Sequence, residues 1–553
     1  MQVRRLAVVA GAALALTLGL SSITSPASAQ SAVALAGSIA SAEEGPMEGV
    51  IVSAKKDDST VTVSVISNAQ GRYSFPASRL EPGRYSLQIR AVGYDLEGPK
   101  AAEVKAGEPA TADLKLRKTR NLSKQLTNAE WMMSVPGTDD DKLQLINCVS
   151  CHTLERVVKS THDADEFVQV IARMNGYAQV SQPIKPQRRV DQSRAANPER
   201  FRKVAEYLAT INLSSGMKHE FELKTLPRVK GRSTNVVITE YDLPRPTIEP
   251  HDVIIVNGEA WYTNFGEQFL GKVDPKTGKH TEYAMPELRK GFPTGNLDLG
   301  VDRQGNLFLG MMYQAGVAKF DPKTEKFQIW QLPPERLRDD SQLNMVTNQA
   351  HVDGKLWVND AGPSTLFRLD LATGKFEEFD PLSVLPGDRR GYSIYDVRAD
   401  SQNNVYVTDF QKNYVIRVDA KTGKFTAYQT GTPFSRNRRG RIDDQDRFWF
   451  AEYRGNKIAM LDTKEERIQE WPLPTKFTQP YDVIWDKNGD LWTGGMTTDR
   501  VVRLNPKSGE TVEYPLPRDT NMRRMFVDNS TTPPTFWVGS NHGASIVRVE
   551  PLD

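Results

Sequence analysis

Short runs of alternating hydrophobic and polar residues, separated by turn residues, fill the stretch from residue 31 to residue 118. The run over residues 60–66 and the run over residues 83–87 show the period of two that is typical of strands with one buried face. Glycine and proline stand between the runs, where reversals of the chain are expected. This pattern predicts a small β-sandwich over residues 31–118.

The hydrophobic period lengthens to that of helices between residues 120 and 215. We expect one helix over residues 142–154, a second over residues 165–174, and a third that begins at residue 198 or 199 and ends near Ile211. A polar loop separates the last two helices. This arrangement predicts a small all-α domain over residues 120–215, followed by a linker.

Residues 235–553 are repetitive, in units of about 40 to 50 residues that each have the pattern of four strands. An aromatic residue recurs at the centre of every unit, at Trp261, Phe308, Trp357, Tyr406, Trp449, Trp492 and Trp537. Seven such units predict a seven-bladed β-propeller. The seventh unit lacks a fourth strand, and the strand pattern over residues 237–244 is expected to complete it, which would close the ring and protect a sheet edge.

Charge and the N-terminal residues narrow the possible functions. The 71 basic and 69 acidic side chains give a net charge of +2, so nucleic-acid binding is not expected. Residues 1–29 predict a secretory signal peptide, because Arg4 and Arg5 precede an apolar run over residues 6–20 and a small-x-small cleavage pattern follows. That run is shorter than the roughly 20 residues of a membrane span. We therefore expect a soluble periplasmic protein without an integral membrane segment.

The two cysteines of the chain lie in the motif Cys148-Val149-Ser150-Cys151-His152, which is the attachment signal of c-type haem. The thiols would form thioether bonds with the haem vinyl groups, and His152 would be the proximal iron ligand. A zinc site would need two further ligands and no other cysteine exists, and a redox dithiol would be expected in a βαβ context rather than between helices. The motif therefore predicts one covalently bound haem c.

The distal iron ligand has three candidates in the sequence, which are His162, Met174 and Met217. His162 is too near His152 to reach the opposite face of a haem comfortably. The segment resembles small class I-like cytochrome c domains, in which a methionine after the attachment motif is the distal ligand. This resemblance implies Met174, and the alternative is a methionine that packs in a core. A thioether ligand would raise the reduction potential relative to a second histidine.

The predicted sandwich resembles the carboxypeptidase regulatory-like, transthyretin-like domain. The matching residues are Gly37, the turns over residues 68–73 and 80–85, and the pair Gly93-Tyr94. The resemblance covers nearly the whole segment. The family has no catalytic residues in this module, so no chemistry is assigned to it.

The repeats resemble the streptogramin (virginiamycin B) lyase family, through Glu249-Pro250-His251-Asp252-Val253 and residues 449–458. The resemblance implies Mg²⁺ and a histidine-based elimination that opens a cyclic depsipeptide. One catalytic histidine of the family would fall near Arg438 or Arg439, and another at Tyr481. His251 has the right local motif but stands in a different blade relative to Glu452. The set is not reproduced, so the catalytic residues are unknown, and the candidates are His251, Glu452 and Tyr481.

A polar site is also expected in the propeller channel. Asn264, Asp360 and Asp409 follow the central strands of three units, and inner strands point their ends at the channel. These oxygen ligands could bind a divalent cation such as Mg²⁺ or Ca²⁺, or they could orient a polar substrate. The structural alternative is that they cap turns.

Together these features predict a periplasmic oxidoreductase. The propeller would bind a small-molecule substrate, and the cytochrome domain would pass electrons to a soluble acceptor protein. Haem c carries one electron, and a two-electron oxidation normally needs another cofactor, of which the sequence shows no signature. Two alternatives are an electron-transfer or docking partner of a periplasmic dehydrogenase, and a Mg-dependent lyase with an appended cytochrome.

Overall fold

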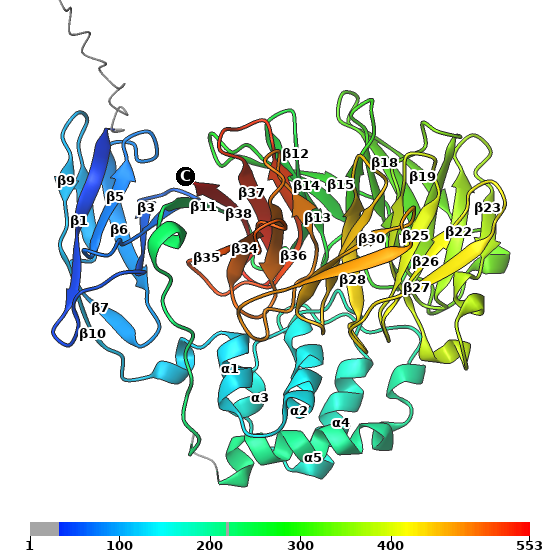
Figure 1. The fold of residues 1–553 in the computed structure, drawn as a ribbon, viewed down its shortest axis with the longest axis horizontal. Coiled ribbons are helices and arrows are strands. Elements are labelled where there is room, and N and C mark those ends of the chain that lie inside the picture. The colour runs from blue at the N-terminus through cyan, green and yellow to red at the C-terminus, as the bar shows by residue number, and fades with distance from the viewer. Residues whose placement is uncertain (1–31, 217–219) are drawn as a thin grey trace, which may run out of the picture.

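The computed structural model describes residues 32–216 and 220–553 (Figure 1). The predicted signal peptide and Met217 lie outside the described residues. No helix in the described ranges is long and apolar enough to cross a membrane.

Residues 33–118 form the predicted β-sandwich, with a core that includes Leu35, Ile39, Val52 and Phe75. One sheet contains β1 (Val33–Ser41), β2 (Gly45–Pro46), β5 (Arg72–Pro76), β7 (Tyr94–Gly98), β9 (Ala110–Thr111) and β10 (Leu114–Lys118). The facing sheet contains β3 (Ile51–Lys56), β4 (Val61–Ile66), β6 (Gly83–Arg90) and β8 (Ala101–Val104).

The C-terminal half folds into seven antiparallel groups of four strands, which are the blades of a propeller (Figure 1). Blade 1 contains β12 (Pro250–Val256), β13 (Glu259–Asn264), β14 (Phe269–Val273) and β15 (His280–Ala284). Blade 2 contains β16 (Leu297–Val301), β17 (Leu307–Gly310), β18 (Gly316–Asp321) and β19 (Lys326–Gln331). Blade 3 contains β20 (Leu343–Val346), β21 (Lys355–Asp360), β22 (Thr365–Asp370) and β23 (Phe376–Phe379). Blades 4 and 5 are β24 (Ile394–Ala399), β25 (Val405–Asp409), β26 (Tyr414–Val418) and β27 (Phe425–Gln429); and β28 (Asn437–Ile442), β29 (Phe448–Glu452), β30 (Lys457–Asp462) and β31 (Arg467–Pro472). Blades 6 and 7 are β32 (Ile484–Trp485), β33 (Leu491–Gly495), β34 (Arg500–Leu504) and β35 (Thr511–Pro515); and β36 (Met522–Asp528), β37 (Thr535–Ser540), β38 (Ser545–Pro551) and β11 (Val236–Asp242).

Strand β11 completes blade 7, as the sequence predicts. It pairs antiparallel with β38, from Val236 opposite Pro551 to Asp242 opposite Ser545. Its other edge pairs with β4 of the sandwich, so the sandwich sheet continues blade 7 without a break. Both edges of β11 are therefore covered, which removes a template for unwanted strand pairing.

Irregular pairing of the innermost strands decides which of their side chains face the channel. In six blades the register between the first and second strands shifts, as between Pro250 and Val253 in blade 1. Such a bulge leaves an extra residue and re-aims its side chain. Two consecutive side chains of one strand can then both face the channel.

Residues 122–215 form helices and turns that lie along one end of the propeller (Figure 1). The α-helices are α1 (Asn128–Ser134), α2 (Asp139–Leu143), α3 (Glu155–Val158), α4 (Ala164–Asn175) and α5 (Arg202–Ile211). The 3-10 helices are η1 (Leu122–Lys124), η2 (Gln144–Ser150), η3 (Ser193–Ala195), η4 (Pro198–Phe201) and η5 (Leu213–Ser215). We call residues 122–215 the helical cap.

The expected helices over residues 165–174 and 198–211 correspond to α4 and to η4 with α5. The expected continuous helix over residues 142–154 is wrong, because α2 ends at Leu143 and the tighter η2 carries the chain to Ser150. Asn147, Cys148 and Ser150 are weak formers of α-helix, and short 3-10 segments are frequent connectors.

Several polar contacts attach the helical cap to the propeller. Asp139 pairs with Lys476 at 2.7 Å and Asp140 with Arg454 at 2.9 Å, both on the propeller end that the cap covers. The side chain of Gln187 donates to the carbonyl of Thr294 at 3.1 Å, on the side of the first two blades. Because these contacts reach blades on opposite sides of the ring, the cap closes this end of the channel.

Candidate site between the helical cap and the propeller channel

The Cys148-x-x-Cys151-His152 motif lies in η2 and the residues that follow it. Both cysteines are free thiols and, like His152, they are half-buried. Burial raises the pKa of each thiol to about 11. The Nδ1 atom of His152 is 3.0 Å from the carbonyl oxygen of Thr153. A proton on Nδ1 would be donated to that carbonyl, which leaves the lone pair of Nε2 available to a metal.

Blade 7 of the propeller holds the backbone of this motif. The carbonyl of Val149 accepts a hydrogen bond from Nδ2 of Asn521 at 3.0 Å. The carbonyl of Ser150 accepts one from Nη2 of Arg523 at 3.1 Å and lies 3.1 Å from Nε2 of His542. The segment between the two thiols is therefore fixed directly against the channel.

Met174 lies at the end of α4 with 40% of its side chain exposed. This exposure excludes the alternative of a methionine packed in a core. Ile184 and Val190, on the loop that follows, are also exposed. His162 is half-buried, with Nδ1 3.4 Å from the carboxylate of Glu166. The distal position of Met174 stays a prediction.

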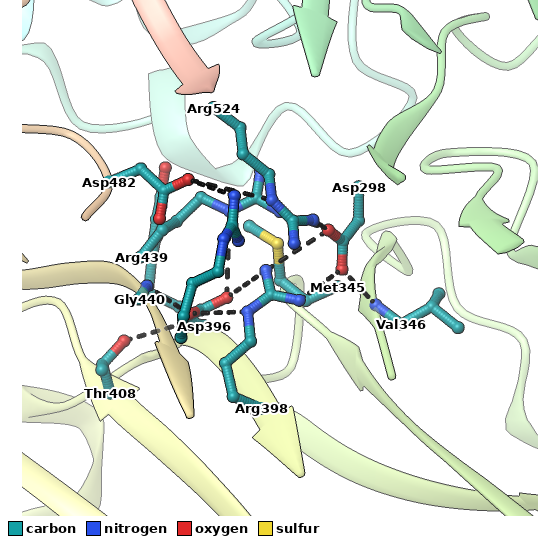
Figure 2. Close-up of polar contacts among 12 residues, drawn as sticks. Asp298, Met345, Val346, Asp396, Arg398, Thr408, Arg439, Gly440, Asp482 and Arg524 are labelled. Carbon is teal, nitrogen blue, oxygen red and sulfur yellow. Dashed lines mark hydrogen bonds and ion pairs between the residues drawn. The ribbon is translucent and has the colours of Figure 1, made fainter. Parts of the chain in front are cut away.

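Deeper in the channel, buried aspartates and arginines from different blades form one ion-pair network, part of which Figure 2 shows. We call it the channel plug, and its members are Asp252, Asp298, Asp396, Asp482, Arg398, Arg439, Arg441 and Arg524. Arg439 is central, because it bonds Asp252 at 3.0 Å and also bonds Asp298. Burial alone would raise the pKa of Asp252. Arg439 and His251 outweigh this effect and hold that pKa well below its usual range. Four carboxylates and four guanidinium groups balance, so the plug is neutral.

A second ring of side chains lies between the plug and the helical cap. We call it the channel mouth, and its members are His251, Tyr395, Arg438, Tyr481 and Arg523. Each precedes a plug residue in the sequence, as in His251-Asp252 and Tyr481-Asp482. The bulges of the inner strands explain how both neighbours face the channel.

A chain of hydrogen bonds crosses the channel mouth. The hydroxyl of Tyr395 lies 2.7 Å from that of Tyr481, which lies 3.1 Å from Nε2 of His251. Nδ1 of His251 bonds the carboxylate of Asp252. Burial lowers the pKa of His251 to about 3. The imidazole is therefore neutral at pH 7, with Nε2 placed to exchange a proton with Tyr481.

The arginines of the channel mouth differ from those of the plug. The guanidinium of Arg438 lies 3.9 Å from the ring centroid of Tyr453 and 4.6 Å from that of Tyr481. Its Nη1 is 3.2 Å from the sulfur of Met496. Arg523 lies over Tyr481 and donates to the carbonyl of Ser150. Neither arginine pairs with a carboxylate in the described part of the chain.

Two buried glutamates have strongly shifted pKa values. Glu249 directly precedes the first inner strand, and burial raises its pKa to about 8. Glu452 ends β29, and burial, with a smaller effect from Glu470, raises its pKa to about 8. Of the three predicted catalytic candidates, the structure brings His251 and Tyr481 together through a hydrogen bond. Glu452 lies at the end of the second strand of blade 5.

The three other predicted channel residues bind the backbone of their own blades. The Oδ1 atom of Asp360 accepts from the backbone amide of Gln342 at 2.6 Å, and that of Asp409 accepts from the amide of Ser393 at 3.0 Å. Asn264 accepts from the amide of Gly266 at 3.2 Å. These contacts are those of the turn-capping alternative. Residues 32–216 and 220–553 contain no group of three or more His, Cys, Asp or Glu placed to hold a metal ion, and a divalent cation stays a prediction.

From the sequence, Arg438 and Arg439 are predicted only as replacements for a lyase histidine, and no role is predicted for Arg523 or His542. A usable signal was present, because polar pairs recur at the inner strands of separate repeats. These pairs are His251-Asp252, Tyr395-Asp396, Arg438-Arg439, Tyr481-Asp482 and Arg523-Arg524. Alignment of the repeats on their inner strands would have placed them in two rings.

Comparison with known proteins identifies two parts of the chain. Residues 382–552 match the virginiamycin B lyase family, and residues 34–117 match the carboxypeptidase regulatory-like domain. A solved streptogramin B lyase is 21% identical with a TM-score of 0.50, over 58% of this chain and 99% of that one. The virginiamycin B lyase from Staphylococcus aureus is 20% identical with a TM-score of 0.48, over 57% of this chain and 98% of that one. No curated protein matches the chain. The predicted sandwich module and the lyase-like propeller fold are confirmed.

Proposed function

We propose that this chain is an exported haem c oxidoreductase, which oxidises a small-molecule substrate at the channel mouth and delivers the electrons to a soluble acceptor protein. One observation carries the proposal. The peptide between Cys148 and Cys151 is hydrogen-bonded to Asn521 and Arg523 beside the channel mouth. The attachment motif and the polar cluster of the propeller therefore form a single site.

The residues of the motif fit haem c. Cys148 and Cys151 are free thiols on one tight turn, available for two thioether bonds. His152 has Nδ1 against a backbone carbonyl, the arrangement that orients the other ring nitrogen toward iron. Met174 has an exposed thioether and would be the second iron ligand. Haem c bound there would supply a one-electron carrier.

The residues of the channel mouth supply proton transfer. A one-electron oxidation of a substrate hydroxyl or amine is the step for which a single bound haem c could accept the electron, and it releases one proton. The Tyr481 hydroxyl can accept that proton while it passes its own to Nε2 of His251. Asp252 bonds Nδ1 and fixes the orientation of the ring, and a proton on Nε2 would be passed on because burial lowers the pKa of His251 to about 3. The hydroxyl of Tyr395 adds one further group to this series of hydrogen bonds.

Export follows from the signal peptide predicted in residues 1–29 and from the need of c-type haem for attachment outside the cytoplasm. Both features support a periplasmic location. A soluble periplasmic cytochrome or oxidase subunit would then be the acceptor.

The test begins with expression in a host that matures c-type cytochromes. Haem should remain attached on a denaturing gel, and the double variant Cys148→Ala/Cys151→Ala should lose it. The ferric protein is then screened with small alcohols, amines and phenols by absorbance of the reduced haem. Reduction by one compound, slowed at least about tenfold in Tyr481→Phe, is the expected result. The exposed-site variant Arg390→Gln is the control, since its side chain is 90% exposed.

Two outcomes would contradict the proposal. If no covalent haem is attached after expression in such a host, the protein lacks the proposed cofactor and the proposed function is wrong. Rapid reduction by a periplasmic dehydrogenase, together with no response to any small molecule, would replace the enzyme with an electron-transfer partner.

A further inference from the structure

The two rings of the channel carry different charge. In the plug, four arginines face four aspartates. In the mouth, Arg438 and Arg523 contact aromatic rings, a methionine sulfur and a backbone carbonyl. Both are more than nine-tenths buried, at 7% and 5% exposure. The mouth therefore holds two guanidinium groups without a counter-charge from the described residues.

The nearby acidic groups do not supply that charge. Asp252 is already engaged by Arg439 and His251. Glu249 forms no ion pair with Arg523 in the described chain, although the charge of Arg523 lowers its pKa. Burial has the larger effect and raises that pKa to about 8, so the carboxyl is mostly protonated at neutral pH. Tyrosine hydroxyls are neutral at pH 7. A buried charge without a partner is costly, so buried charges are normally paired.

Unpaired polar atoms gather at the same place. Four buried atoms have no hydrogen-bond partner among the described residues, and they are Nε of Arg438, Nε of Arg523, the hydroxyl of Tyr453 and Oδ1 of Asn521. Such groups in a native fold call for a partner that binds there. The two guanidinium Nε–H groups are donors, and an anion with several acceptor oxygens could bind them.

The aromatic side chains around the two arginines indicate the shape and polarity of the rest of the ligand. Tyr395 and Phe410 stack at 4.7 Å between ring centroids, and Phe410 also lies 4.8 Å from the guanidinium of Arg438. Phe265 packs against His251 at 4.6 Å. A planar guanidinium matches a carboxylate through two parallel hydrogen bonds, and flat aromatic walls match an apolar, planar body.

We propose that the channel mouth is a carboxylate-binding site, in which Arg438 and Arg523 hold the carboxylate of a planar, largely apolar molecule. Two molecules have this chemistry. One is an organic acid that enters as a free ligand, and the other is the haem tethered at Cys148 and Cys151, through its own propionates. The second source rests on the proposed function, and the first does not.

Benzoate is the probe for a free carboxylate, and benzamide is its uncharged match in shape. Titration calorimetry is done on the haem-loaded full chain and on the haem-free Cys148→Ala/Cys151→Ala chain, after thermal melting shows that the latter is folded. The variants are Arg438→Gln, Arg523→Gln and the conservative Arg438→Lys, with the exposed Arg390→Gln as control. Resonance Raman bands of the haem propionates are recorded on the same loaded proteins.

Binding of benzoate to the haem-loaded chain, weakened about tenfold or more in Arg438→Gln and partly restored in Arg438→Lys, would assign the site to a free carboxylate. Binding only to the haem-free chain, with propionate bands that shift in Arg438→Gln but not in Arg390→Gln, would assign it to the haem. The proposal is overturned if benzoate binds neither chain better than benzamide and the bands do not move. If no haem is attached at all, the proposed function fails, and benzoate binding still decides this inference.

Discussion

Arg438 and Arg439 are consecutive residues of β28, yet only Arg439 bonds to carboxylates. Arg439 reaches Asp252 and Asp298 in the channel plug, whereas Arg438 lies against the rings of Tyr453 and Tyr481 in the channel mouth. The register shift between Asn437 and Gly440 makes this possible, because the bulge directs both side chains into the channel at different depths. One strand thus provides a structural cation and a cation available to a ligand.

This difference predicts opposite effects on stability for two adjacent substitutions. Arg439→Met should lower the free energy of unfolding by about 3–5 kcal/mol, because it leaves buried aspartates without their partner. Arg438→Met should leave stability unchanged or raise it, because it replaces an unpaired buried charge by an apolar chain. Urea unfolding of the ligand-free proteins compares the two. Equal destabilisation would show that Arg438 also has a carboxylate partner.

Stability should fall as the pH rises from about 5 to 8. Burial raises the pKa of Glu249 from 4.5 to about 8, so in this window the folded protein binds a proton that the unfolded chain has released. The unfolding free energy then decreases with pH, by at most about 1.4 kcal/mol per pH unit for one group. Glu249→Gln should reduce this slope, as measured by urea unfolding at several pH values. Glu287→Gln, at an exposed carboxylate, should keep the slope of the parent.

Closure of the propeller by β11 should contribute strongly to stability. Ile238 is fully buried in the core of blade 7, and Ile238→Ala should cost about 2–5 kcal/mol. Leu552 follows β38 and is 53% exposed, so Leu552→Ala serves as the control. Thermal melting by circular dichroism compares the two variants with the parent. A small loss in Ile238→Ala would indicate that the ring is held closed without β11.

The reduction potential tests the distal ligand. If Met174 binds the iron, Met174→His should lower the midpoint potential, because imidazole is the better donor to ferric iron. Ile184→Ala, at another exposed residue of the helical cap, should leave the potential unchanged. Spectroelectrochemical titration of the haem-loaded chain gives both values. An unchanged potential and spectrum in Met174→His would assign the distal position to another group.

The sequence alone determined the features that depend on local pattern. The alternation of the sandwich, the repeat of the blades and the spare strand over residues 237–244 follow from side-chain periodicity and from the need to cover a sheet edge. The attachment motif is likewise a matter of five consecutive residues. The helix expected around that motif was wrong, because periodicity does not distinguish an α-helix from the tighter turn of η2 in so short a stretch.

Only the tertiary structure decided which polar residues share a site. The plug contact between Arg439 and Asp252 joins residues 187 positions apart, and the contact between Arg523 and Ser150 joins residues 373 positions apart. Such pairs are set by the closure of the ring and by the docking of the cap, which bring distant strands to one channel. Whether an arginine is paired or free for a ligand depends on those neighbours, and no local pattern contains that information.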